Sequence, residues 1–299
     1  MMKYKKRGDW AELMPGKKVL SQDDRSMAAE KWLLDELGMP EKLLNELKAN
    51  NGIQLAGDRL RLALFPSAPY GIVPRYVELD VLYEDDFCLV VNKPVGMPIH
   101  PDGSERQDGI VTLDHAVAGY YQASGLEVAV KHIHRLDVDT SGPVLYAKNR
   151  YAELKLNAMM QLKQIERKYV AIVHGVVAQN KEKIDLPIGK DRHHKQRRRV
   201  SPTGQHAVTH METSERLREA TVIRLRLETG RTHQIRVHLS HLEHPLFGDT
   251  LYGGMREGIR RQALHGEELS FRHPFTGELL TVTAPWPQDM MDLYDSLKL

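Results

Sequence analysis

HRLDVDTSG occupies residues 134–142 and is flanked by apolar runs at residues 128–134 and 144–148. The two runs, separated by a Thr-Ser-Gly turn, predict a strand, a loop and a second strand. Asp137 therefore lies where a strand feeds a loop, a place at which rigid scaffolds present reactive groups. Aspartate also caps turns, so these residues taken alone favour a capping role for both Asp137 and Asp139.

Short strands and a few helices fill most of the chain after residue 80. The spacing of apolar residues predicts strands at residues 87–92, 168–177, 207–213 and 222–228, helices at residues 112–121, 151–165 and 232–242, and a hairpin at residues 269–284. Short links join many of these strands. The pattern is typical of an α+β domain with a mainly antiparallel mixed sheet.

The N-terminal part has a different pattern. Apolar residues recur at helical spacing in residues 26–37, and residues 53–64 alternate like a pair of hairpin strands. Three prolines make residues 66–74 resemble a linker. The chain is therefore divided into an N-terminal module with its linker, residues 1–79, and a larger domain, residues 80–299.

Composition is that of an ordinary globular protein. The 299 residues carry a formal net charge of +2, which does not by itself indicate a nucleic-acid partner. One cysteine, Cys88, excludes a disulfide within the chain and cysteine-based metal sites, and it suits a reducing cytosol. The basic N-terminus lacks the apolar core of a signal peptide, and no apolar run approaches the ~20 residues of a membrane span. A cytoplasmic location is expected.

Three more segments accompany residues 134–142. They are NKPVGM at residues 92–97, followed by His-Pro at 100–101; RKYVA at residues 167–171; and TGRTHQIRVH at residues 229–238, running on to His-Pro at 244–245 and Gly-Asp at 248–249. In content, order and spacing the four segments resemble the signature segments of the RluA-type family of RNA pseudouridine synthases. The resemblance covers roughly residues 80–285.

The resemblance implies roles for three side chains. It makes Asp137 the catalytic carboxylate, pairs Arg231 with it, and places the ring of Tyr169 against the target base. Arg231 also follows Gly230 at a predicted helix start, where a cation opposes the helix dipole and so needs a specific partner. From its strand alone, Tyr169 is interpreted as a core residue.

Basic residues are most concentrated in residues 190–199, where Asp191 is the single acid. Such a run is either a solvated loop or a loop that binds phosphates, and an RNA substrate favours the second interpretation. Lys93 and Arg135 either contact backbone phosphate or support Asp137. The residues predicted to bind RNA are Lys93, Arg135, Lys190, Arg192, Lys195, Arg197, Arg198 and Arg199.

The implied reaction converts a uridine of ribosomal or transfer RNA into its isomer, so no cofactor is expected and no obligate protein partner is inferred. The chain has no phosphate loop, dinucleotide fingerprint or His-Glu-x-x-His motif. The histidines at positions 233, 238, 241 and 244 lack the further ligands of a zinc site, so no metal is expected either.

Two other functions fit parts of the pattern. A glycosidase needs two carboxylates roughly 5–9.5 Å apart across one bond, and Asp137 and Asp139 do not obviously flank one. The alternative is a catalytically inactive RNA-binding protein of the same fold, against which the joint presence of Asp137, Tyr169 and Arg231 argues. Residues 24–65 faintly resemble an S4-type RNA-binding module with few basic residues, so a degenerate S4-like α/β module is expected there.

Overall fold

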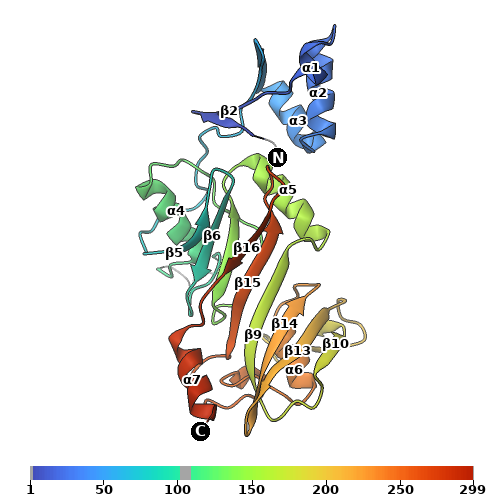
Figure 1. The fold of residues 1–299 in the computed structure, drawn as a ribbon. Helices are drawn as coiled ribbons and strands as arrows, with labels where there is room; N and C mark the ends of the chain where they lie inside the picture. Colours follow the sequence, from blue (N-terminus) through green and yellow to red (C-terminus); the bar gives the residue numbers. More distant parts are fainter. Residues whose placement is uncertain (1–2, 102–108, 299) are drawn as a thin grey trace.

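The computed structural model describes residues 3–101 and 109–298, and two antiparallel sheets dominate it (Figure 1). The larger sheet has six strands in the order β10-β13-β14-β9-β15-β16. They are β9 (Glu166–His174), β10 (Lys181–Asp185), β13 (Val208–Arg216), β14 (Ala220–Leu227), β15 (Leu264–Arg272) and β16 (Leu279–Thr283). The other sheet, in the order β5-β6-β8-β7, consists of β5 (Asp80–Glu84), β6 (Cys88–Lys93), β7 (Lys131–His132) and β8 (Gly142–Ala147). The predicted α+β class with mainly antiparallel strands is confirmed.

Helices cover both faces of the six-stranded sheet. Alternate residues of a strand point to opposite faces, so β9 sends Tyr169 and Ala171 to one side and Val170 and Ile172 to the other. The first face packs against α6 (Gln234–His241), and the second packs against α7 (Gln288–Lys298). Because both faces of β9 are buried, the sequence of this strand is an almost continuous apolar run.

The four-stranded sheet is covered in the same way. One face packs against α4 (Leu113–Ala123), and the other packs against α5 (Arg150–Gln161). Thr112 and Asn149 cap these two helices by accepting hydrogen bonds from backbone N–H groups of the first turn. The predicted strand at residues 128–134 was too long, because the segment pairs with β8 only over β7.

The two sheets meet beside the loop that holds Asp137. Ser141 forms an isolated β-bridge with His265 there, and the N–H of Gly266 donates to the carbonyl of Ser141 at 2.8 Å. Gly142 has a φ of +129°, and a Cβ on it would lie 2.5 Å from the Gly266 oxygen. The glycine of the HRLDVDTSG segment is therefore required for the close approach of the sheets.

The N-terminal part contains a third sheet with helices on one side. Its strands, in the order β1-β2-β4-β3, and its helices are β1 (Lys5–Arg7), β2 (Trp10–Leu13), α1 (Lys17–Leu20), α2 (Arg25–Asp35), α3 (Glu41–Ala49), β3 (Ile53–Ala56) and β4 (Arg59–Leu62). Leu33 and Leu37 share one apolar cluster with Phe87 and Phe275, and the hydroxyl of Tyr151 donates to the Leu37 carbonyl at 3.1 Å. The boundary near residue 79 and the S4-like character stay predictions.

Residues 66–79 cross the surface of the larger domain without helix or strand. The N–H of Arg75 donates to the His115 carbonyl at 3.0 Å, and a Cβ on Gly119 would lie 2.3 Å from the Arg75 oxygen. The predicted linker is thus fixed along α4. None of the helices in the described part of the chain combines the length and apolarity that a membrane span requires.

We expect Gly142→Ala to destabilise the protein by at least about 2 kcal/mol, because it adds both backbone strain and a clash with Gly266. Gly277→Ala is the matched control, since Gly277 also has a positive φ of +74° but has no atom within 4 Å of an added Cβ. It should cost about 1–2 kcal/mol. Urea unfolding measures both, and equal losses would contradict the role assigned to Gly142.

Candidate active site

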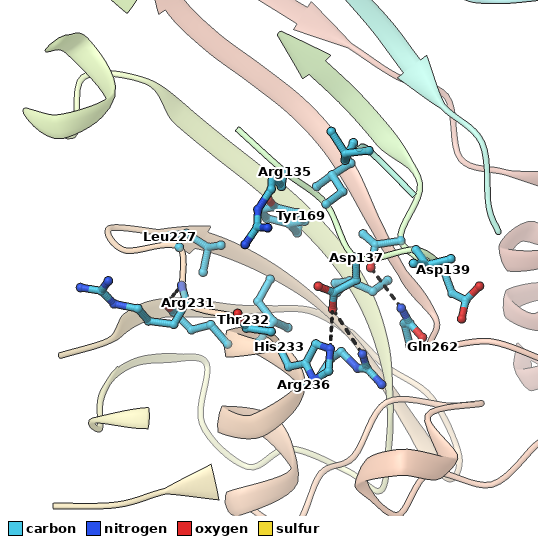
Figure 2. Close-up of a pocket in the computed structure, with 18 of the residues that line it drawn as sticks. Arg135, Asp137, Asp139, Tyr169, Leu227, Arg231, Thr232, His233, Arg236 and Gln262 are labelled. Carbon is cyan, nitrogen blue, oxygen red and sulfur yellow. Dashed lines mark hydrogen bonds and ion pairs between the residues drawn. The ribbon is translucent and has the colours of Figure 1, made fainter. Parts of the chain in front are cut away.

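A cleft of about 1720 Å³ opens at the junction of the two sheets (Figure 2). Its walls are the loop at residues 134–140, one end of β9, the turn at residues 228–236 that leads into α6, and the segments at residues 248–251 and 260–264. Three of the four signature segments line this one cleft, although they are far apart in the sequence.

Asp137 is held in this cleft by Arg236. The Nη1 of Arg236 lies 3.3 Å from Oδ2 of Asp137, while Nε and Nη2 donate to the two oxygens of Asp249 at 2.7 and 2.8 Å. The Asp249 side chain is 1% exposed and that of Asp137 is 27% exposed. Burial opposes the charge on Arg236, but the hydrogen bonds to Asp249 and the charge of Asp137 outweigh it and raise the pKa of Arg236. Arg236 therefore stays charged and presents one Nη to the carboxylate of Asp137.

The expected pairing of Arg231 with Asp137 is wrong. The Nε of Arg231 donates to the His206 carbonyl at 3.0 Å, and Figure 2 shows its side chain pointing away from Asp137. Arg231 lies in the turn before α6, whereas Arg236 lies inside the helix on the side that faces the cleft. The sequence contained a signal, since Arg236 ends the GRTHQIR segment and Asp249 belongs to the Gly-Asp pair that follows it.

His233 and Tyr252 complete the surroundings of Asp137, and neither was assigned from the sequence. The Nε2 of His233 lies 4.0 Å from Oδ2 of Asp137, and its Nδ1 lies 2.8 Å from the hydroxyl of Tyr252. Burial lowers the pKa of His233, with the Arg236 charge acting in the same direction. The guanidinium of Arg236 also lies over the Tyr252 ring, 5.0 Å from its centroid.

Tyr169 lines the cleft from β9 and is 5% exposed. Burial raises the pKa of its hydroxyl, the nearby Asp137 acts in the same direction, and Arg167 opposes them. The phenol is therefore protonated at neutral pH. Figure 2 shows that Tyr169 and Asp137 both line the cleft.

Lys93 does not reach the surface, so its predicted contact with RNA is wrong. It is fully buried, and its Nζ donates to the carbonyls of Pro94, Met97 and Val138 at 2.8, 2.9 and 2.7 Å. Burial lowers the pKa of Lys93 to about 7, against the charges of Asp139 and Asp137. Its ammonium instead braces the loop that carries Asp137, the second role considered for it from the sequence.

The basic run forms a short hairpin of β11 (Ile188–Lys190) and β12 (Arg198–Val200). Lys195 and Arg198 line the cleft, as does the exposed Arg135. Arg197 lies over the Tyr252 ring, 5.6 Å from its centroid. The remaining three, Lys190, Arg192 and Arg199, are exposed and do not line the cleft.

Three of the histidines considered for zinc, at positions 233, 238 and 244, are engaged elsewhere. Both ring nitrogens of His238 have partners, Thr209 Oγ1 and the Leu186 carbonyl, each at 2.9 Å. His244 Nδ1 lies 2.9 Å from the His174 carbonyl.

One group within residues 3–101 and 109–298 has the spacing of metal ligands: Asp85, Cys88 and His273. Thr276 N–H donates to Nδ1 of His273 at 3.0 Å, which places the ring proton on Nε2, 2.7 Å from Asp85. Burial raises the pKa of the Cys88 thiol. The group is satisfied as a His–Asp pair and needs no ion.

Comparisons with known proteins agree with this geometry. The family model of RNA pseudouridylate synthases matches residues 87–241. The chain belongs to the RNA pseudouridylate synthase family. The chain is 45% identical to the uncharacterized RNA pseudouridine synthase YhcT of Bacillus subtilis (strain 168), over 84% of this chain and 83% of that one. It is 42% identical to ribosomal large subunit pseudouridine synthase D of Vibrio parahaemolyticus serotype O3:K6 (strain RIMD 2210633), over 74% and 71%.

Solved structures of this family share the fold. Human RNA pseudouridylate synthase domain containing 1 matches with a TM-score of 0.57 and 26% identity over 70% of this chain and 84% of that one. Human RNA pseudouridylate synthase domain containing 4 matches with a TM-score of 0.60 and 22% identity over 73% and 93%. The RluA-type resemblance and the interpretation as an RNA pseudouridine synthase are confirmed.

We expect Arg236→Gln to destabilise this pseudouridylate synthase by about 3–5 kcal/mol, because it leaves the buried Asp249 without a counter-charge. Arg231→Gln is the matched control and should stay within about 0.5 kcal/mol, since Arg231 makes one exposed hydrogen bond. Urea unfolding of both variants gives the comparison. A larger loss for Arg231→Gln would restore the pairing predicted from the sequence.

Proposed function

We propose that this chain converts uridine to pseudouridine in RNA with Asp137 as its catalytic carboxylate. The observation that carries the proposal is the ion pair of Arg236 with Asp137 in a cleft that Tyr169 also lines. A half-exposed carboxylate held beside a fixed guanidinium in a cleft is suited to attack on an electron-poor centre or to stabilisation of one. Asp139 points away from Asp137 in Figure 2, which disfavours a two-carboxylate hydrolase.

The reaction breaks the N1–C1′ bond, turns the base, and joins C5 to C1′, after which the C5 proton leaves and N1 takes up a proton. Asp137 is the group that meets the sugar or base, and Arg236 balances its charge as it changes. Tyr169 offers its ring as a surface on which the freed uracil stacks. Reactant and product have the same composition, so the proposal includes no cofactor and no metal.

The proposed substrate is a uridine in ribosomal RNA, since several relatives are named ribosomal large subunit pseudouridine synthase D; transfer RNA is the other class considered. The uridine must leave its stack to reach Asp137, which costs a few kcal/mol and favours loops and bulges. We place the enzyme in the cytoplasm and include no obligate protein partner in the proposal.

The hairpin of β11 and β12 is proposed to bind RNA phosphates. Its basic side chains are exposed or half-exposed beside the cleft, and Lys195 and Arg198 extend into it. The N–H of Arg198 donates to the hydroxyl of Tyr252 at 2.8 Å, so the hairpin is anchored to the wall of the site. Arg135 is proposed to contact phosphate from the opposite wall.

Asp137→Asn should abolish pseudouridine formation while leaving RNA binding and the fold largely unchanged, because the amide keeps the shape but loses the charge. Purified protein incubated with uridine-labelled ribosomal RNA gives one of three products: pseudouridine, free uracil, or unchanged uridine. Asp139→Asn is the control and should retain activity. Turnover by Asp137→Asn within tenfold of the unsubstituted enzyme would remove Asp137 from the mechanism.

Neutralising Lys195 and Arg198 to Gln should weaken RNA binding and flatten its dependence on salt. Each lost phosphate contact lowers the slope of log K against log[salt] by about 0.7 for single-stranded RNA and about 0.9 for a duplex. Lys181→Gln with Lys183→Gln is the matched control, since both are exposed lysines of β10 that do not line the cleft. An equal change of slope in the control pair would make the hairpin an ordinary charged loop.

A further inference from the structure

Arg167 is a buried cation without an anion. It lies on β9, lines the cleft and is 8% exposed. Its Nε is inaccessible and makes no hydrogen bond, and no ion pair joins it to any acid in residues 3–101 or 109–298. A buried charge is normally paired, because its removal from water is costly. The mechanism proposed above does not use this side chain.

The carboxylates that line the cleft beside Arg167 are engaged by other cations. Glu228 pairs with His210 at 2.6 Å and with Lys163 at 3.2 Å, and Asp137 pairs with Arg236 at 3.3 Å. The positive charge of Arg167 is therefore left for a ligand rather than for a neighbouring side chain.

His134 adds a second donor without an acceptor. Its Nε2 accepts a hydrogen bond from the N–H of Leu145 at 3.3 Å, so the ring proton lies on Nδ1, for which the described residues offer no partner. Burial, followed by the charge of Arg167, lowers the pKa of His134 to about 3, which keeps the ring neutral. Both side chains line the same cleft, but Nδ1 of His134 is inaccessible, so the donors that a ligand can reach are the two Nη groups of Arg167.

Gly230 leaves room for the guanidinium. A Cβ at position 230 would lie 3.0 Å from Nη1 of Arg167, tighter than ordinary contact. The glycine of the GRTHQIR segment thus lets Arg167 lie against the backbone of the turn that leads to Arg236.

We propose that the guanidinium of Arg167 binds a phosphodiester group of the RNA strand that carries the target uridine. This inference rests on the proposed RNA substrate. An anion is required because a neutral base carbonyl would leave the buried charge uncompensated, and the guanidinium fork matches two phosphate oxygens. Arg167 and Tyr169 lie two residues apart on one face of β9, about 7 Å. The phosphate therefore belongs to the target nucleotide or its neighbour.

Arg167→Met tests the site because stability and binding should change in opposite directions. Replacing an unpaired buried charge by an apolar side chain of similar length should raise the melting temperature by about 2 °C or more. It should also remove the extra stabilisation that inorganic phosphate gives over chloride at equal ionic strength. Lys168→Met is the matched control, since Lys168 points to the other face of β9 and pairs with Glu268 at 2.8 Å. It should leave the phosphate effect intact.

Gly230→Ala keeps the charge but pushes Nη1 of Arg167 aside by a few tenths of an ångström, so it should weaken the phosphate effect without gaining stability. This variant decides the question if Arg167→Met does not fold. Binding of an oligouridylate to the Asp137→Asn enzyme should weaken about tenfold to a hundredfold when Arg167→Met is added, and the salt slope should fall by about 0.7.

A lower melting temperature for Arg167→Met together with an undiminished phosphate effect would make Arg167 a packing residue and overturn the site. An undiminished phosphate effect in Gly230→Ala would do the same. The phosphate measurement needs no turnover, so a failure of the pseudouridine assay would leave it informative. The two proposals can therefore fail separately.

Discussion

The bidentate ion pair between Arg236 and the buried Asp249 fixes the geometry of the site. A cation in the first turn of α6 opposes the helix dipole, and Asp249 compensates for it so that one Nη remains for Asp137. The loop that brings Asp249 below the helix depends on two glycines. Added Cβ atoms would lie 2.0 Å from the Arg261 oxygen at Gly248 and 1.9 Å from the Leu246 oxygen at Gly254.

Three of the buried cations near the cleft, Arg236, Lys93 and Arg167, are stabilised in different ways. Carboxylates neutralise Arg236, and three backbone carbonyls surround the ammonium of Lys93. Arg167 has neither. The carbonyls around Lys93 brace a loop without adding charge, and the carboxylates around Arg236 hold its charge in place. The unpaired guanidinium of Arg167 must be compensated by favourable packing elsewhere in the protein. The carbonyls around Lys93 shape the Asp137 loop, and the pair with Asp249 orients Arg236 toward Asp137. The unpaired Arg167 suits the anion site proposed for it.

The sequence predicted the fold class, and it predicted that Asp137 and Tyr169 share one site, because both residues belong to signature segments at strand ends. It did not distinguish Arg231 from Arg236. Five residues along a helix correspond to about 140° of rotation, so the choice depends on where the helix begins. The helix was expected to begin at residue 232, but it begins at Gln234, because His233 has a left-handed backbone conformation. Lys93 was misplaced because one of its acceptors, Val138, is distant in sequence and known only from the packed fold.

The hairpin of β11 and β12 is connected through two hydrogen bonds to the His233 ring beside Asp137. The N–H of Arg198 donates to the Tyr252 oxygen, and the Tyr252 hydroxyl lies 2.8 Å from Nδ1 of His233. Every donor has an acceptor if the Tyr252 hydroxyl donates to Nδ1 of His233. The proton of the neutral His233 ring then lies on Nε2. That proton then faces Asp137 across 4.0 Å. The backbone of the hairpin thereby determines which ring nitrogen presents a donor to the carboxylate.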